Sequence, residues 1–162
     1  MLAVPGGASA APTGDFDWPL RPRPAVERRF DAPERDWLPG HRGVDLAGTA
    51  GQSVLAAGEG VVVFAGTVAG RPVVSVEHQG GLRTTYEPVR AAVSTGGRVR
   101  RGTVLGTLAA GHPGCPAAAC LHWGLRRESG QRGKPEYLDP LGLLRLVPVR
   151  LLPSAPEHHT PE

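Results

Sequence analysis

Residues 53–66 read SVLAAGEGVVVFAG and residues 72–78 read PVVSVEH, and these two stretches decide the fold class. Both contain short runs of β-branched residues bounded by turn-forming residues, a pattern typical of strands. The segments at 58–60 and 79–81 have the composition and spacing of hairpin connections. We therefore expect an all-β protein with a compact, curled antiparallel sheet.

The same alternation of short apolar runs and turns continues through residues 82–89 (LRTTYEPV), 96–110 (GGRVRRGTVLGTLAA) and 119–127 (ACLHWGLRR). Gly (23) and Pro (17) are frequent and scattered, which also favours many short strands joined by tight turns. Only residues 140–146 (PLGLLRL) have a helical pattern. We expect a short C-terminal helix there.

A chain of 162 residues is long enough for one domain with its own core. We assign residues 16–150 to this domain. Residues 1–15 are expected to be a disordered leader or the remnant of a signal peptide, because Ala8 to Ala10 resembles a cleavage site but no basic start or apolar stretch precedes it. Residues 151–162 are expected to be a disordered tail. No apolar run reaches the ~18 residues that a membrane span needs.

The net charge of +3 comes almost wholly from arginine, since Lys134 is the only lysine. Mild basicity suits an anionic partner such as a bacterial wall polymer or a nucleic acid. The arginines are spread along the chain and no aromatic stacking platform is evident, so we do not expect nucleic-acid binding.

His41 and Asp45 form a His-x-x-x-Asp pair inside the glycine-rich stretch GHRGVDLAG. Imidazole and carboxylate are both zinc ligands, and a catalytic zinc typically has three protein ligands and one open position. The alternative is that His41 caps a turn while Asp45 pairs with Arg42 or a backbone amide. The pair alone does not decide between them.

His122 is the third candidate ligand. In a strand over 119–127, alternation places Cys120, His122 and Gly124 on one face, and Leu121 and Trp123 on the other. The imidazole could then reach a metal held by the first pair. A histidine that simply faces solvent is the alternative.

In chain order, the motifs resemble those of the lysostaphin/LytM-type zinc endopeptidases over residues 16 to 144. The motifs are WPL (18–20), HRGVDL (41–46), SVLAAGEGVVVFAG (53–66), VSVEHQGGLRTTYEPV (74–89), GGRVRRGTVLGTL (96–108), CLHWGLR (120–126) and YLDPL (137–141). The resemblance implies a β core of the duplicated hybrid motif kind, Zn²⁺ in a groove, and peptidoglycan or its peptides as substrate. It also implies a secreted or cell-surface bacterial protein, which we expect to be a monomer.

Carried over residue by residue, the resemblance makes His41, Asp45 and His122 the zinc ligands. Two assisting histidines of the family are replaced. Cys120 stands at the first position of the family's final His-x-His motif, and Glu87 lies in the Tyr-x-His region. Glu87 is a candidate general base. His112 is a second candidate for the missing proton-transfer group, or else a turn residue with no catalytic role.

Cys120 has three interpretations: a fourth zinc ligand, a free thiol that substitutes for histidine, or a disulfide partner of Cys115. We favour the disulfide, because the only two cysteines lie five positions apart.

Arg42 and Arg126 flank the expected site and are candidates for binding substrate carboxylates, the alternative being that they are ordinary solvated surface residues. Arg127 is expected to be solvated, and His78 to be a surface turn residue. The competing functional hypothesis is a catalytically impaired, zinc-binding module that binds or regulates the cell wall.

Overall fold

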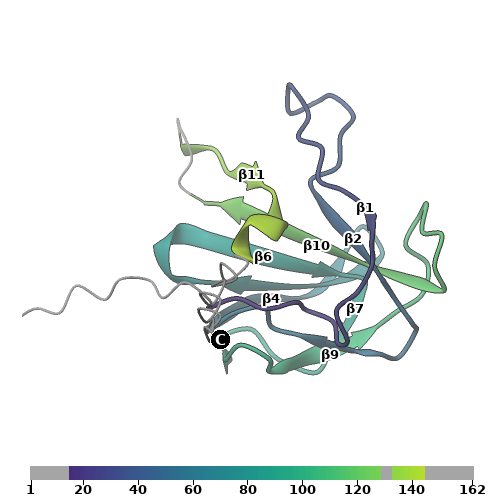
Figure 1. Ribbon diagram of the computed structural model, residues 1–162. Helices are drawn as coiled ribbons and strands as arrows, with labels where there is room; N and C mark the ends of the chain where they lie inside the picture. The colour runs from purple at the N-terminus through teal and green to yellow at the C-terminus, as the bar shows by residue number, and fades with distance from the viewer. Residues whose placement is uncertain (1–14, 129–132, 145–162) are drawn as a thin grey trace, which may run out of the picture.

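The computed structural model describes residues 15–128 and 133–144, which form two antiparallel sheets (Figure 1). The larger sheet has the order β1-β2-β10-β6-β5-β4-β8, and β11 pairs with β10. Its strands are β1 (Val26–Arg28), β2 (Gly43–Gly48), β4 (Gly60–Val68), β5 (Arg71–Glu77), β6 (Leu82–Glu87), β8 (Arg98–Val99), β10 (Ala119–Arg127) and β11 (Glu136–Leu138). The smaller sheet has the order β3-β9-β7, made of β3 (Ser53–Leu55), β9 (Val104–Leu108) and β7 (Val89–Ala91). The all-β, antiparallel prediction is confirmed, but the described strands form two sheets instead of one.

The turns between strands follow the local sequence in two cases. Ala69 and Gly70 both have positive φ between the paired strands β4 and β5, which is the two-residue turn that matches strand twist. The segment Gln79–Gly81 (η1) joins the paired strands β5 and β6, as predicted. The hairpin predicted at 58–60 is wrong, because this segment carries the chain from β3 in the smaller sheet to β4 in the larger one.

The core contains apolar side chains from both sheets. Trp123 and Leu121 of β10 are fully buried and join one cluster with Val54 of β3 and Leu105 of β9. Burying each such side chain contributes about 1.5–3 kcal/mol. His122, between the two buried residues of β10, is on the opposite face, so the predicted alternation is confirmed.

The predicted C-terminal helix is wrong in type and length. Pro140–Leu143 (η3) is a four-residue 3-10 turn that Asp139 caps by accepting a hydrogen bond from the backbone N–H of Leu141. Leu141 and Leu143 pack against the core, so tertiary contacts hold this segment without a longer helix. Residues 145 and 146 of the predicted helix lie outside the described residues.

The domain limits at 15/16 and 150/151 remain predictions, since the leader up to residue 14 and the whole tail lie outside the described residues. Among the residues that the structure describes, no helix has the length and apolarity needed to cross a membrane.

Candidate metal centre

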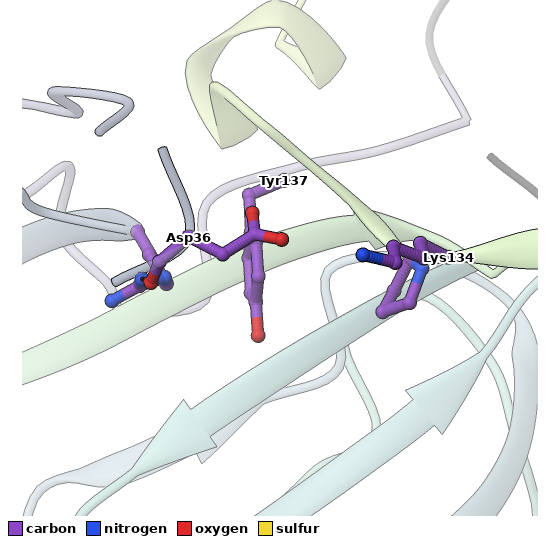
Figure 2. Close-up of a pocket in the computed structure, with 5 residues that line it drawn as sticks. Asp36, Lys134 and Tyr137 are labelled. Carbon is purple, nitrogen blue, oxygen red and sulfur yellow. Dashed lines mark hydrogen bonds between the residues drawn. The ribbon is translucent and has the colours of Figure 1, made fainter. Parts of the chain in front are cut away.

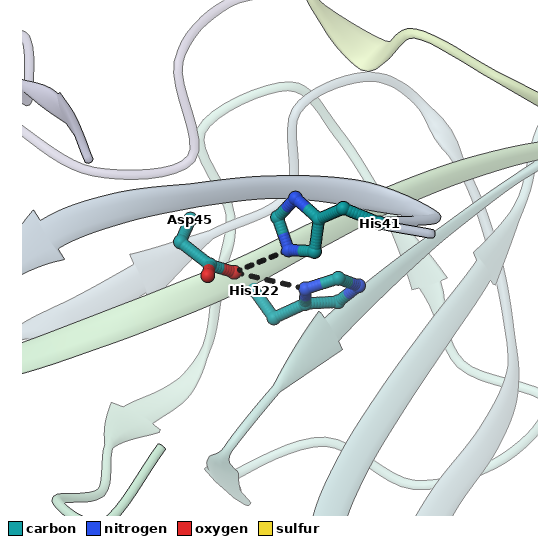
Figure 3. Close-up of side chains that lie close together, drawn as sticks. All are labelled: His41, Asp45 and His122. Atoms are coloured by element: carbon teal, nitrogen blue, oxygen red, sulfur yellow. Dashed lines mark hydrogen bonds and ion pairs between the residues drawn. The ribbon is translucent and has the colours of Figure 1, made fainter. Parts of the chain in front are cut away.

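Neighbouring strands bring the three predicted ligands together. Asp45 of β2 lies directly opposite His122 of β10, and Nδ1 of His122 is 2.9 Å from Oδ1 of Asp45. His41 precedes β2, where its backbone bridges that of Asp31, and its Nε2 is 3.0 Å from the same oxygen. Figure 3 shows both imidazoles turned toward this carboxylate.

Burial and one backbone contact fix the orientation of this group. His41 and Asp45 are 5% and 2% exposed. Nδ1 of His41 lies 2.8 Å from the carbonyl oxygen of Arg29, which can only accept, so Nδ1 donates and Nε2 is left as the donor atom for a metal. The ligand atoms of His41, Asp45 and His122 all lie within 4.8 Å of one another.

A third imidazole reaches the same carboxylate. Nε2 of His112 is 3.1 Å from Oδ1 of Asp45, and its side chain is only 11% exposed. The other ring nitrogen, Nδ1, is buried and has no hydrogen-bond partner. His112 is not part of the three-residue group of converging ligand atoms, so it stands beside the metal position.

Three ring nitrogens thus surround a single oxygen atom, Oδ1 of Asp45. A carboxylate oxygen has about two lone-pair sites, so it cannot accept ordinary hydrogen bonds from all three. Burial by itself raises the pKa of Asp45, but the hydrogen bond from His122 and the neighbouring imidazoles outweigh it and hold the pKa below its ordinary value. The carboxylate is therefore kept ionised among potential metal ligands.

Gly43 makes room for the His122 ring. A Cβ atom at this position would lie 2.7 Å from Nε2 of His122 and 2.5 Å from the carbonyl oxygen of Trp123. A larger residue at 43 would therefore push the imidazole away from Asp45.

Glu87 of β6 lies opposite His122 in the register of β6 and β10, but it is not one of the converging ligands. Its Oε1 is 3.0 Å from Nε of Arg71, an ion pair without the alignment of a hydrogen bond. The carboxylate is 18% exposed and the Arg71 side chain 51%. Glu87 is therefore near the site but already paired with a cation.

Cys115 and Cys120 form a disulfide, as favoured from their spacing. The other two interpretations of Cys120, a zinc ligand and a free thiol, are wrong because the sulfur is bonded and fully buried. The bridge closes the loop that follows His112 onto the start of β10.

A groove of about 560 Å³ extends from His122 and Glu87 across β10, β6, β5 and β4. Gly124 of β10 lies opposite Thr85 of β6, which in turn lies opposite Ser75 of β5, and these small residues form its floor. The candidate substrate-binding residues Arg42 and Arg126 both line it.

Sequence reasoning did not identify two other residues of the groove, Arg71 and Tyr137. Nothing local distinguishes them from solvated residues. The prediction for His78 was wrong: it is 6% exposed, with Nδ1 2.7 Å from the carbonyl oxygen of Glu59 and Nε2 2.7 Å from Oγ1 of Thr84.

The sequence profile of peptidase family M23 matches residues 39–136, a range that contains all three converging ligands. The chain belongs to peptidase family M23. It is also 59% identical, over 156 residues, to uncharacterized proteins of Mycobacterium tuberculosis and Mycobacterium bovis. The alignment covers 95% of this chain and 62% of each relative, so the chain spans less than two thirds of their length.

Solved structures show the M23 fold. A Helicobacter pylori Csd3 structure is 26% identical, with a TM-score of 0.62 over 81% of this chain and 33% of that one. Lysostaphin gives a TM-score of 0.62 at 22% identity, over 82% of this chain and 55% of that one. A zinc-containing peptidase from Vibrio cholerae gives a TM-score of 0.59 at 22% identity, over 75% of this chain and 38% of that one. At these identities the last two matches show the fold alone.

Proposed function

We propose that this M23 domain is a zinc metallopeptidase that cleaves peptides of bacterial peptidoglycan, and that it acts outside the cell membrane. The convergence of His41, Asp45 and His122, of which His122 lines the groove, is the observation that carries the proposal. The disulfide is compatible with an oxidising location outside the cytoplasm.

The donor set fits zinc. Two imidazole nitrogens and one carboxylate oxygen are the ligand types of catalytic zinc sites, in which three protein ligands leave one position open. The backbone contact of His41 with Arg29 supplies the outer hydrogen bond that usually orients a ligating histidine. Because Nδ1 of His41 donates to Arg29, Nε2 of the neutral ring carries a lone pair and cannot donate to Oδ1 of Asp45. A cation between the rings would use that lone pair.

When bound, zinc polarises a peptide carbonyl and lowers the pKa of water. Peptide hydrolysis also needs a group that delivers a proton to the departing amine. His112 supports this role better than Glu87 does. Its imidazole adjoins the ligand group and its buried Nδ1 has no partner in the described part of the chain, whereas Glu87 is paired with Arg71.

The groove would hold the peptide substrate. Its floor of Gly124, Thr85 and Ser75 leaves room for an extended chain beside His122, and hydroxyl groups on the floor can bind backbone groups of the peptide. Arg42 and Arg126 can bind carboxylates along it. Arg126 also contacts Glu128, so a substrate carboxylate would compete with that residue.

The test is digestion of purified peptidoglycan by the zinc-loaded chain, with soluble peptides separated by chromatography and identified by mass spectrometry. We expect new amino termini that a chelator prevents from forming and that added zinc restores. Zinc-loaded, folded protein that releases no peptides would contradict the enzymatic proposal.

A catalytically impaired cell-wall binding module is the second candidate. It is favoured by the bonded sulfur of Cys120 and the paired carboxylate of Glu87, which replace the two assisting histidines. In that case the zinc-loaded protein should sediment with peptidoglycan without cleaving it, and His112→Ala should not alter the amount bound.

A further inference from the structure

A second cavity, of about 400 Å³, adjoins the groove and is lined by Asp36, Arg42, Lys134, Pro135 and Tyr137. Arg42 and Tyr137 line both spaces. Figure 2 shows Asp36, from the segment between β1 and β2, near Tyr137 of β11 and Lys134, which lies just before β11. A peptide in the groove could therefore place a side chain or chain end in this cavity.

Charged groups of both signs line this cavity without neutralising one another. Among the residues that the structure describes, Asp36, Arg42 and Lys134 form no ion pair with each other or with another side chain. Arg42 does donate from Nη2 to the backbone oxygen of Asp36 at 2.5 Å. That bond fixes the guanidinium without cancelling its charge.

Tyr137 holds the arginine in place from the other side. The guanidinium carbon of Arg42 lies 5.5 Å from the centroid of the Tyr137 ring, a cation–π arrangement. A guanidinium held in this way loses little further freedom when it binds a carboxylate. Among the described residues that line the cavity, Lys134 adds a second cation and Asp36 supplies the one carboxylate.

We propose that this cavity is a specificity subsite for a peptide group that carries both a carboxylate and an ammonium. Arg42 and Lys134 bind the carboxylate, and Asp36 binds the ammonium. The inference rests on the proposed function, because it takes the adjoining groove as a peptide-binding site. Neutral peptides such as glycine bridges would leave the charges of Asp36, Arg42 and Lys134 unused.

Four synthetic peptides that differ at a single side chain test the proposal. That residue is 2,6-diaminopimelate, which carries both groups, 2-aminopimelate (carboxylate only), lysine (ammonium only) or norleucine (neither). Dissociation constants are measured by fluorescence anisotropy at low salt, with zinc-loaded and with chelator-treated protein. Cleavage is measured separately, so binding does not depend on catalysis.

We expect the diaminopimelate peptide to bind most tightly, with each charge contributing up to about fivefold, the range of exposed ion pairs. Lys134→Gln should reduce the advantage of the carboxylate, and Asp36→Asn should remove that of the ammonium. Arg90→Gln, on β7 of the smaller sheet, and Glu59→Gln are matched controls at exposed positions. Both should leave the affinity gained from the carboxylate and from the ammonium unchanged.

Equal affinity for all four peptides would overturn the inference even if the protein cleaves them, and so would no binding of any. Charge-dependent binding without cleavage by the zinc-loaded protein would support the subsite and contradict the enzymatic function. The two proposals therefore fail by different results.

Discussion

Asp45 and His122 lie directly opposite each other on the antiparallel strands β2 and β10, and Oδ1 of the first is 2.9 Å from Nδ1 of the second. The sheet register, not a loop, therefore sets the distance between two ligands that are 77 positions apart in the chain. Sites on regular elements are held more precisely than sites on loops. His41 adds the third ligand from just before the start of β2.

Gly43→Ala should disturb the centre through its effect on His122. The added Cβ would lie within 2.7 Å of the imidazole and 2.5 Å of the Trp123 carbonyl. We expect a loss of about 1–3 kcal/mol in the free energy of unfolding, typical of overpacking, and weaker zinc binding. Urea denaturation and zinc titration measure the two effects.

Gly142→Ala is the matched control, because a Cβ at that position meets nothing within 4 Å. It should change the free energy of unfolding by less than about 0.5 kcal/mol. Equal behaviour of the two variants would contradict the role given to Gly43.

Replacing both cysteines by serine should destabilise the domain. In the chain-entropy account, a bridge that closes so short a loop contributes about 2 kcal/mol. The loop that carries His112 would also lose its tie to β10. Thermal unfolding with and without reductant measures the loss of stability: reductant should lower the melting temperature of the wild type. It should not alter the melting temperature of the double variant, which has no bridge to reduce.

The contact between His112 and Asp45 predicts a separate effect on hydrolysis. His112→Ala should lower the rate of peptide cleavage by about 10²- to 10⁴-fold, the range for loss of one proton-transfer group, while zinc remains bound. Glu87→Gln should have a smaller effect, because Arg71 already pairs with that carboxylate. A larger loss in the Glu87 variant would reverse the two assignments.

His78 should make stability depend on pH. Burial lowers the pKa of His78 from its ordinary 6.5, although its hydrogen bond to the Glu59 carbonyl acts in the opposite direction. As pH falls below about 6.5, the unfolded chain therefore takes up the proton before the folded protein does. The contribution of His78 is complete above that pH and is lost as pH falls through the lowered pKa, by at most about 1.4 kcal/mol per pH unit.

Urea denaturation between pH 8 and pH 5, with the wild type and His78→Gln, isolates this effect. The variant should be less stable at neutral pH and should show a weaker dependence on pH. Identical slopes for the two proteins would contradict the assignment.

The ligand strand was predictable because its pattern is local. Leu121 and Trp123 are apolar, His122 between them is polar, and a strand must place them on opposite faces. The all-β fold followed from β-branched runs of strand length in the same way. The disulfide followed from the short separation of two cysteines.

What the sequence did not indicate depends on contacts between distant segments. The segment at 58–60 has turn composition whether the strands beside it pair or separate, and β9, some fifty residues later, is the partner of β3. His78 follows a strand like a surface residue but is covered by Phe16, whose ring centroid is 5.1 Å away. His112 was named as a candidate from the sequence, but its segment has no periodicity, so nothing local indicated that its ring lies against Asp45.

Zinc titration into chelator-treated protein tests the central claim most directly. One zinc ion should bind per chain, and His41→Ala, Asp45→Ala and His122→Ala should each lower the affinity by more than about 100-fold, since a lost outer-shell partner alone costs 10- to 100-fold. Glu59→Gln, at an exposed position, should bind zinc like the wild type. Zinc binding that survives in all three ligand variants, or no binding by the unaltered chain, would contradict the account.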